Sequence, residues 1–199
     1  MAKQKWITPV AVAEWPRLAT PNTKFNPDGT WELQLRFTGE EAEQVKKVLD
    51  EMMEKSVQEA QELLQKKPTK LKNLNKVYPY DEQEDGSVIV KLRKKAVVRK
   101  KDGSTYNTTI TIVDPLLKPL DPREVTAGSL VRADLTLETY YMPGNNSAMV
   151  LKRWYAVQLL KKNDTPMVGF DAVPEYATDF EEDEKIDAIG EGGFVDPDF

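Results

Sequence analysis

The 199-residue chain contains neither cysteine nor histidine. It therefore has no disulfide bond, no thiol nucleophile, no imidazole general base and no Cys/His metal site. Long apolar runs are also missing, since no stretch approaches the roughly 18 apolar residues of a membrane-spanning helix, and the N-terminal segment Met1–Trp6 lacks the apolar run of a signal peptide. We expect an intracellular protein with no membrane partner, no metal and no cofactor.

Positive and negative charges are divided unequally along the chain. Residues 1–162 hold 27 Lys and Arg against 21 Asp and Glu, whereas residues 163–199 hold one Lys against 12 acids. The net charges of these two parts are +6 and −11, which give the total of −5. A basic body with an acidic end favours a polyanion-binding surface that carries its own competitor. An acidic tail that only keeps the protein in solution explains the same composition.

Alternating apolar and polar residues predict a mainly β protein with an antiparallel sheet of five or six strands. The strands are expected at Lys5–Trp15, Thr30–Phe37, Ser87–Arg99, Thr105–Val113, Ser129–Tyr141 and Ala148–Leu160. Residues 16–29 are rich in turn formers and are expected to be a connector, and Asp102-Gly103 is expected to be a hairpin turn. Closing such a sheet into a small barrel removes its exposed edges, and Trp6, Trp15 and Trp31 are expected in the barrel core.

One long helix is predicted after the second strand, over about residues 39–67. Thr38 and Glu41 have the spacing of a capping box, and Pro68 marks the end of the helix. Between these limits the apolar residues form a stripe on one side of the helix. We expect this stripe to cover the protein's own sheet, with a coiled-coil homodimer as the alternative.

The strand Ser87–Arg99 carries cations on one face. Successive residues on one face of a strand are about 6.7 Å apart, which is close to the phosphate spacing of an extended single strand. The cations on this face and in the turn that follows are Lys91, Arg93, Lys95, Arg99, Lys100 and Lys101. The stripe favours contact with a nucleic acid, although lysines on a solvated sheet edge also discourage aggregation.

Aromatic residues accompany cations in the last two strands. Arg132 and Tyr140 share a face of one strand, and Arg153 and Tyr155 share a face of the other. Sequence-independent binding of single-stranded nucleic acid requires this combination, because aromatic rings stack on bases and cations follow the phosphates. We therefore add these four residues to the predicted DNA-binding set.

Catalytic motifs are not found in the sequence. It contains no glycine-rich phosphate loop and no serine with a plausible general base. Asp114, Asp134 and Glu138 are the candidates for a two-metal nuclease, which requires carboxylates from several strand ends to converge. We expect a protein that is not an enzyme.

Several short motifs, taken in order, resemble those of a known family. They are Pro21-Asn22-Thr23-Lys24-Phe25, Gly29-Thr30-Trp31-Glu32-Leu33, Gly86 with Val90-Lys91-Leu92-Arg93, Ile112-Val113-Asp114, Gly128-Ser129-Leu130-Val131, Thr139-Tyr140-Tyr141, Ala156-Val157-Gln158 and Asp196-Pro197-Asp198-Phe199. With the long helix after the second strand, they are similar to the single-stranded-DNA-binding proteins of tailed bacteriophages. That family has an OB fold and an acidic C-terminal tail that ends in phenylalanine.

The resemblance implies an OB-fold domain over residues 1–162 and an acidic, largely disordered tail over 163–199. It implies non-catalytic coating of single-stranded DNA in phage replication, recombination and repair, in the cytoplasm of the infected bacterium. The tail is then expected to compete with DNA and to contact the phage DNA polymerase and helicase-primase. The tail residues expected to do this are Asp179, Glu181, Glu182, Asp183, Glu184, Asp196, Asp198 and Phe199. The alternative is a protein–protein adaptor or structural phage protein that uses the long helix as its interface.

Overall fold

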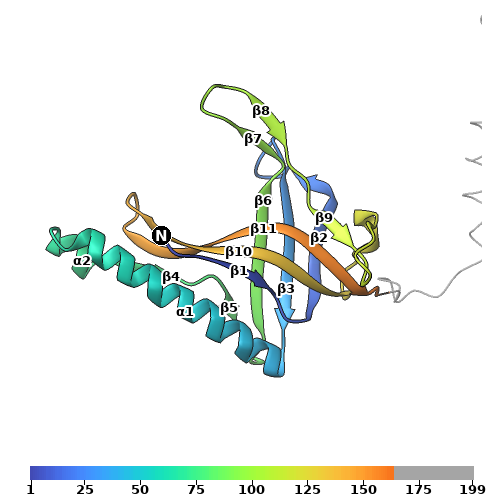
Figure 1. Cartoon of the computed structure of the whole chain (residues 1–199), viewed down its shortest axis with the longest axis horizontal. Coiled ribbons are helices and arrows are strands. Elements are labelled where there is room, and N and C mark those ends of the chain that lie inside the picture. The colour runs from blue at the N-terminus through green and yellow to red at the C-terminus, as the bar shows by residue number, and fades with distance from the viewer. Residues whose placement is uncertain (164–199) are drawn as a thin grey trace, which may run out of the picture. The chain divides into compact units, whose positions relative to one another are not determined.

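Most of the chain that the structure describes belongs to one twisted sheet and a long helix beside it (Figure 1). The structure is a computed structural model, and it describes residues 1–163. The eight predicted tail residues from Asp179 to Phe199 lie outside the described residues. The strands are β1 (Lys3–Ile7), β2 (Ala11–Asn22), β3 (Thr30–Phe37), β4 (Asn75–Val77), β5 (Asp81–Glu82), β6 (Val88–Lys95), β7 (Val97–Arg99), β8 (Thr105–Asn107), β9 (Thr111–Val113), β10 (Leu130–Met142) and β11 (Ser147–Lys161). The helices are α1 (Gly39–Leu64), α2 (Pro68–Lys72) and the short 3-10 helix η1 (Pro122–Glu124).

The main sheet has the strand order β4-β11-β10-β2-β3-β6-β5. β1 also pairs with β10 and β9 with β11, whereas β7 and β8 form a separate two-stranded sheet. All the pairs are antiparallel except those of β4 and β9 with β11. The mainly β, antiparallel character predicted from the sequence is confirmed.

The two ends of this strand order come from one short stretch of chain, residues 75–82. Its first part, β4, pairs with β11, and its last part, β5, pairs with β6. Between them the carbonyl of Pro79 accepts a hydrogen bond from Lys152 Nζ of β11 at 2.5 Å. Within the described residues no ladder joins β6 directly to β11. The predicted barrel would close with a ladder of hydrogen bonds between β6 and β11. In the described residues this ladder is absent, and residues 75–82 bridge the seam between the two strands instead.

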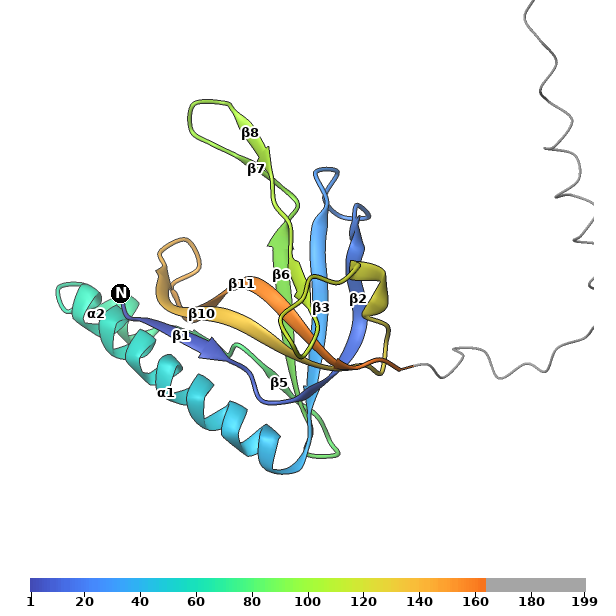
Figure 2. The same ribbon diagram turned by 45° about the vertical axis from the view of Figure 1, so that its right-hand side comes forward.

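The core lies between the inner face of the sheet and α1 (Figure 2). Val88, Val90 and Leu92 of β6 are buried, in agreement with the alternation of that strand. The apolar stripe of α1 is buried in the same core, at Ala42, Val45, Leu49, Met52, Met53, Ala60 and Leu64. The helix thus covers its own sheet, as expected. It ends at Leu64, three residues earlier than predicted, and Thr38 occupies the N-cap position without a side-chain cap hydrogen bond.

The predicted first strand and the connector after it are wrong in their limits. The first strand is two strands, β1 and β2, so α1 follows the third strand of the chain rather than the second. β2 continues through Pro16 and Pro21, which were expected in the connector. The pairing of β2 with β3 shifts register between Glu14 and Arg17. A proline has no N–H to donate to a ladder, and such a bulge accommodates it.

The two strands predicted after residue 86 are also interrupted. β6 and β7 are separated at Ala96, and β8 and β9 are separated by residues 108–110. The carbonyl of Ala96 accepts from Thr108 N at 2.8 Å, and Ala96 N donates to the carbonyl of Gly29 at 3.0 Å. Ala96 is therefore bonded to two different segments, which lets β7 and β8 leave the main sheet as a hairpin. The turn predicted at Asp102-Gly103 connects them, with Gly103 at a φ of 84°.

Candidate nucleic-acid interface

The outer face of β6 presents three cations in a row, at Lys91, Arg93 and Lys95. All three are exposed, because the alternate residues of the strand face the core. The register with β3 places Lys91 opposite Gln34, Arg93 opposite Glu32 and Lys95 opposite Thr30. The predicted basic stripe therefore forms part of a polar surface shared by β3 and β6.

Three cations of the predicted set are ion-paired with carboxylates of neighbouring segments on this side of the protein. Lys91 Nζ lies 2.8 Å from Asp81 Oδ2, Arg93 Nε lies 3.3 Å from Glu32 Oε1, and Arg99 Nη2 lies 2.9 Å from Asp28 Oδ1. The hydrogen bond from Arg99 lowers the pKa of Asp28. Such exposed pairs are worth little in stability. A polyanion can therefore exchange with these carboxylates at small cost.

Trp15 lies beside these cations on the outer surface. Its side chain is 74% exposed, so its predicted place in the core is wrong. Together with Glu32, Gln34, Lys91 and Arg93 it lines a small hollow in the face of the sheet. The hollow combines one indole ring with two cations, which suits a nucleotide whose base stacks while its phosphate is neutralised.

The bulge in β2 explains why the indole points outward. Trp15 has a φ of 49°, in the left-handed region that a bulky residue rarely adopts. One extra residue stands in β2 between the pairs Glu14–Gln34 and Arg17–Glu32, and it disrupts the inward–outward alternation. The proline that follows Trp15 is the signal in the sequence that marks this position as irregular.

The β7–β8 hairpin extends beyond the end of the main sheet, beside the turn between β2 and β3 (Figure 1). It carries Arg99, and its turn carries Lys100 and Lys101. Tyr106 is exposed on β8, with Lys100 Nζ 5.7 Å from the centre of its ring. The Arg99–Asp28 pair joins the hairpin to the β2–β3 turn. The cations of the hairpin thus continue the row of cations on the outer face of β6.

Exposed aromatic residues near this surface were not among the predicted binding residues. Besides Trp15 and Tyr106, Phe25 in the β2–β3 turn is 86% exposed, with Lys24 Nζ 5.4 Å from its ring centre. The sequence signal for Phe25 and Tyr106 is an aromatic ring in a segment rich in turn formers and cations. An aromatic ring outside an alternating apolar pattern is not carried by a buried face of a strand, so it is expected to be exposed.

The four predicted residues of β10 and β11 are not brought to this cluster. Along the sheet, β2 and β3 separate β10 from β6, whereas β11 faces β6 across the seam without a ladder. Arg132 Nε donates to the carbonyl of Thr8 at 3.1 Å, and Arg153 Nε pairs with Glu138 Oε2 at 2.7 Å. Tyr140 lies near the β10–β11 turn, where its carbonyl accepts from Ser56 of α1, and Tyr155 is exposed on β11. No contact described in residues 1–163 connects these side chains to Lys91 or Arg93.

Lys152 adds a partly buried cation next to the exposed ones. Its ammonium donates to Pro79 in the seam between β11 and β6. The pKa of Lys152 is lowered to about 8, chiefly by burial; Lys91 and Arg93 act in the same direction, whereas Asp81 acts in the opposite one. The amine of Lys152 therefore interacts electrostatically with Lys91 and Arg93, which face the solvent on β6.

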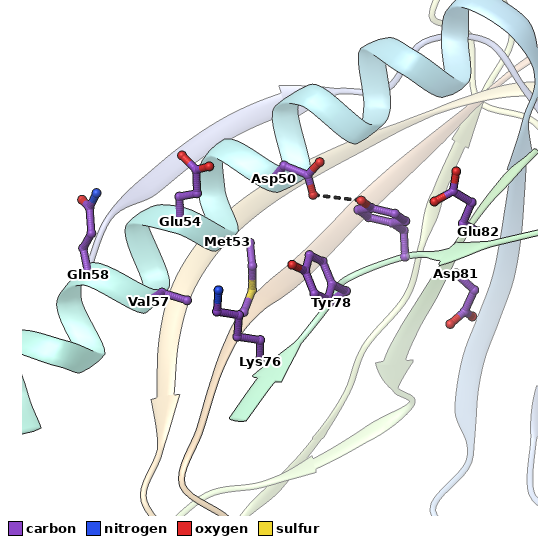
Figure 3. Close-up of a pocket in the computed structure, with 10 residues that line it drawn as sticks. Asp50, Met53, Glu54, Val57, Gln58, Lys76, Tyr78, Asp81 and Glu82 are labelled. Carbon is purple, nitrogen blue, oxygen red and sulfur yellow. Dashed lines mark hydrogen bonds between the residues drawn. The ribbon is translucent and has the colours of Figure 1, made fainter. Parts of the chain in front are cut away.

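A separate groove of about 770 Å³ lies between α1 and residues 76–82 (Figure 3). Met53 and Val57 line it from the helix, and Tyr78 faces them from the other side. Asp50 accepts a hydrogen bond from the Tyr80 hydroxyl at 2.9 Å. The other lining residues are Glu54, Gln58, Lys76, Asp81 and Glu82. Carboxylates dominate the charge of this groove, so it does not suit a phosphate backbone.

The three candidate nuclease carboxylates lie in different places, and two of them have structural roles. Asp114 caps the loop after β9, and buried Glu138 is paired with Lys3 and Arg153. Asp134 lies on β10, opposite Ala156. Residues 1–163 contain no group of three or more acids placed to hold a metal ion. None of the helices in that range is long and apolar enough to cross a membrane.

This fold is that of the single-stranded-DNA-binding proteins of bacteriophages, so the resemblance seen in the sequence is confirmed at the level of the fold. The crystal structure of gp2.5, a single-stranded DNA-binding protein encoded by bacteriophage T7, matches with a TM-score of 0.67 at 19% identity, over 98% of this chain and 100% of that chain. The single-stranded DNA-binding protein of bacteriophage Enc34, in complex with single-stranded DNA, matches with a TM-score of 0.52 at 13% identity, over 82% of this chain and 89% of that chain. Neither a family model nor a curated protein sequence matches the chain.

Proposed function

We propose that this protein binds single-stranded DNA without sequence preference and without catalysis, on the outer face of β2, β3 and β6. The observation that carries the proposal is the hollow in which Trp15 lies beside Lys91 and Arg93. Ring and cations together recognise what all unpaired strands share, namely a base face and a phosphate. The similarity in fold to phage proteins that bind single-stranded DNA supports the same function.

The binding path that we propose runs from Trp15 along β6 to the β7–β8 hairpin. Trp15 stacks with a base on this path. The cations that contact the phosphates are Lys91, Arg93, Lys95, Arg99, Lys100 and Lys101. On entry, phosphates replace Asp81, Glu32 and Asp28 as partners of three of these cations. OB folds commonly bind oligonucleotides on the face of two neighbouring strands and in the adjacent loops.

The acidic segment 164–199 is proposed to compete with DNA for this path and, when DNA displaces it, to contact the phage DNA polymerase and helicase-primase. The charge division of +6 and −11 supports this, since an anionic segment tied to a cationic body acts at high effective concentration. The protein would then act in phage DNA replication, recombination and repair in the cytoplasm of the infected bacterium. An adaptor role through the apolar stripe of α1 has less support, because that stripe is buried in the protein's own core.

A fluorescence titration tests the proposed function. A labelled oligo-dT is titrated with full-length protein at two salt concentrations, with duplex DNA of the same length as the control. We expect binding to oligo-dT that weakens as salt rises, and much weaker binding to the duplex. Equal binding to both DNAs, or none to oligo-dT at low salt, would contradict the proposal. Magnesium-dependent loss of the labelled strand would instead indicate a nuclease.

A further inference from the structure

The loop that follows β9, residues 114–118, is strained and firmly held. Leu117 has a φ of 65°, which is a costly conformation for a leucine. The Asp114 carboxylate accepts from Leu116 N and Lys118 N, both at 2.8 Å, and the Asp114 carbonyl accepts from Leu117 N at 3.1 Å. Gln158 of β11 donates to the same carbonyl at 3.3 Å. Strain of this kind persists only where surrounding bonds enforce it, and it points to a functional position.

This loop presents two adjacent leucines to solvent. Leu116 is 75% exposed and Leu117 is 71% exposed, and Lys118 beside them is exposed as well. A pair of large apolar side chains fixed at the tip of a rigid loop is pre-organised for docking, because little conformational entropy is lost when it binds. We call residues 116–118 the leucine tip.

The groove between α1 and residues 76–82 has the complementary chemistry. Val57 and the exposed ring of Tyr78 provide most of the apolar surface, since Met53 in the lining is largely buried, and Asp50 and Glu54 provide carboxylates along the helix side (Figure 3). Asp81 and Glu82 are already paired with Lys91 and Lys46, whereas Glu54 is exposed on the helix. The groove therefore suits an apolar segment that carries a positive charge, and it repels the acidic tail.

The leucine tip and the groove lie on opposite sides of the body. In Figure 1, β9 and the loop after it lie on the right of the sheet, whereas α1 and β4 lie on the left. A surface on one side that fits a different surface on the opposite side produces a heterologous contact between copies. Repetition of such a contact gives an open row of molecules, or a ring where its rotation closes, rather than a two-fold symmetric dimer.

We propose that the leucine tip of one copy docks in the groove of the next, with Leu116 and Leu117 against Met53, Val57 and Tyr78, and Lys118 facing Glu54. The contact joins neighbouring copies in a row. If DNA lies along β2, β3 and β6 of successive copies, as the proposed function states, the contact makes DNA binding cooperative. This cooperativity rests on the proposed function. The contact itself requires no DNA.

The test compares a short oligo-dT that holds one molecule with a long one that holds many, using full-length protein. We expect wild type to bind the long strand cooperatively. Leu116→Asp/Leu117→Asp should reduce the cooperative gain about tenfold, equivalent to about 1.4 kcal/mol, and leave affinity for the short strand unchanged. Both leucines are exposed, so the substitutions should not unfold the protein, and circular dichroism checks this. Leu63→Asp, at an exposed leucine of α1 outside the groove, is the matched control.

A charge exchange identifies the contact. Lys118→Glu and Glu54→Lys should each weaken cooperativity, and the double variant should restore it. Lys118→Glu with Glu51→Lys, at an exposed position next along the helix, should not restore it. Failure of the Lys118→Glu/Glu54→Lys rescue, or unchanged cooperativity in the leucine variant, overturns the proposal. Cooperativity that is instead lost on deletion of residues 164–199 assigns the contact to that segment and also overturns it.

Sedimentation without DNA separates this proposal from the proposed function. Concentrated wild-type protein should form concentration-dependent oligomers that the leucine variant does not form. If these oligomers appear but oligo-dT is not bound, the contact stands and the DNA-binding function fails. If oligo-dT is bound but no variant changes either oligomers or cooperativity, the function stands and the contact fails.

Discussion

Replacement of Trp15 by alanine is the most direct test of the binding surface. The indole is 74% exposed, so its removal leaves no cavity in the core. Alanine keeps a Cβ, and the backbone strain at the φ of 49° is therefore retained in the variant. We expect the free energy of unfolding to change by no more than about 0.5 kcal/mol, as for other surface substitutions. Any loss of DNA affinity can then be attributed to the ring itself.

The size of the expected effect follows from stacking. Loss of one base–aromatic stack costs about 1–3 kcal/mol, which corresponds to a loss of affinity of roughly 5- to 150-fold. The slope of log K against log salt should not change, because the indole carries no charge and releases no counterion. Trp15→Phe should recover most of the affinity. A charge substitution such as Arg93→Glu should instead change both affinity and slope.

The assay is fluorescence anisotropy with labelled oligo-dT at several salt concentrations. Tyr155→Ala is the matched control, since Tyr155 is an exposed aromatic residue on β11 that does not line the hollow of Trp15, Lys91 and Arg93. We expect this control to bind as wild type does. Wild-type affinity in Trp15→Ala, or an equal loss in both variants, would refute the assignment of the stacking role to Trp15.

Three further predictions concern charge. Glu32→Gln frees Arg93 from its partner at 3.3 Å, so oligo-dT should bind several-fold more tightly, with a salt slope steeper by ~0.7. An unchanged slope in the same anisotropy titration would contradict this. The pKa of Lys152 is lowered to about 8 from 10.5, so between these pH values the unfolded chain holds more protons than the folded one. The free energy of unfolding of wild type should therefore rise relative to Lys152→Met by roughly 1–3 kcal/mol from pH 8 to 10.5, and urea titrations showing a constant difference would disprove the burial argument. Deletion of residues 164–199 should tighten binding to oligo-dT most strongly at low salt, whereas equal affinities of truncated and full-length protein would exclude competition by that segment.

Alternation and helical periodicity predict much of the fold. β6 has its valines and Leu92 inside and its cations outside, and α1 lies with its apolar stripe on the sheet. Both patterns reflect local geometry, because the period of two and the period of 3.6 are properties of the isolated strand and helix. The hairpin turn at Asp102-Gly103 is local in the same way, since Gly103 supplies the positive φ that the turn requires.

The same reasoning fails where a distant segment decides the outcome. The sequence places Trp15 in the core as an apolar residue of a predicted strand, but the register of β2 against β3 shifts just there, and the ring points outward while Ala11 and Ala13 are buried. Residues 75–82 show no strand signal, yet they pair with β11 on one side and β6 on the other. Pairing of this kind depends on which strand is adjacent and not on the segment's own composition.

The sequence by itself determined the charge division, the covering helix and the cationic face of β6, because each follows from composition or from a repeat along a single element. Only the tertiary structure decided which aromatic side chain accompanies those cations. It brought Trp15 beside Lys91 and Arg93, and it placed Tyr140 near the β10–β11 turn, where its carbonyl accepts from Ser56 of α1. The reason is physical: cross-strand neighbours are set by register and bulges, and these arise from the packing of the whole sheet.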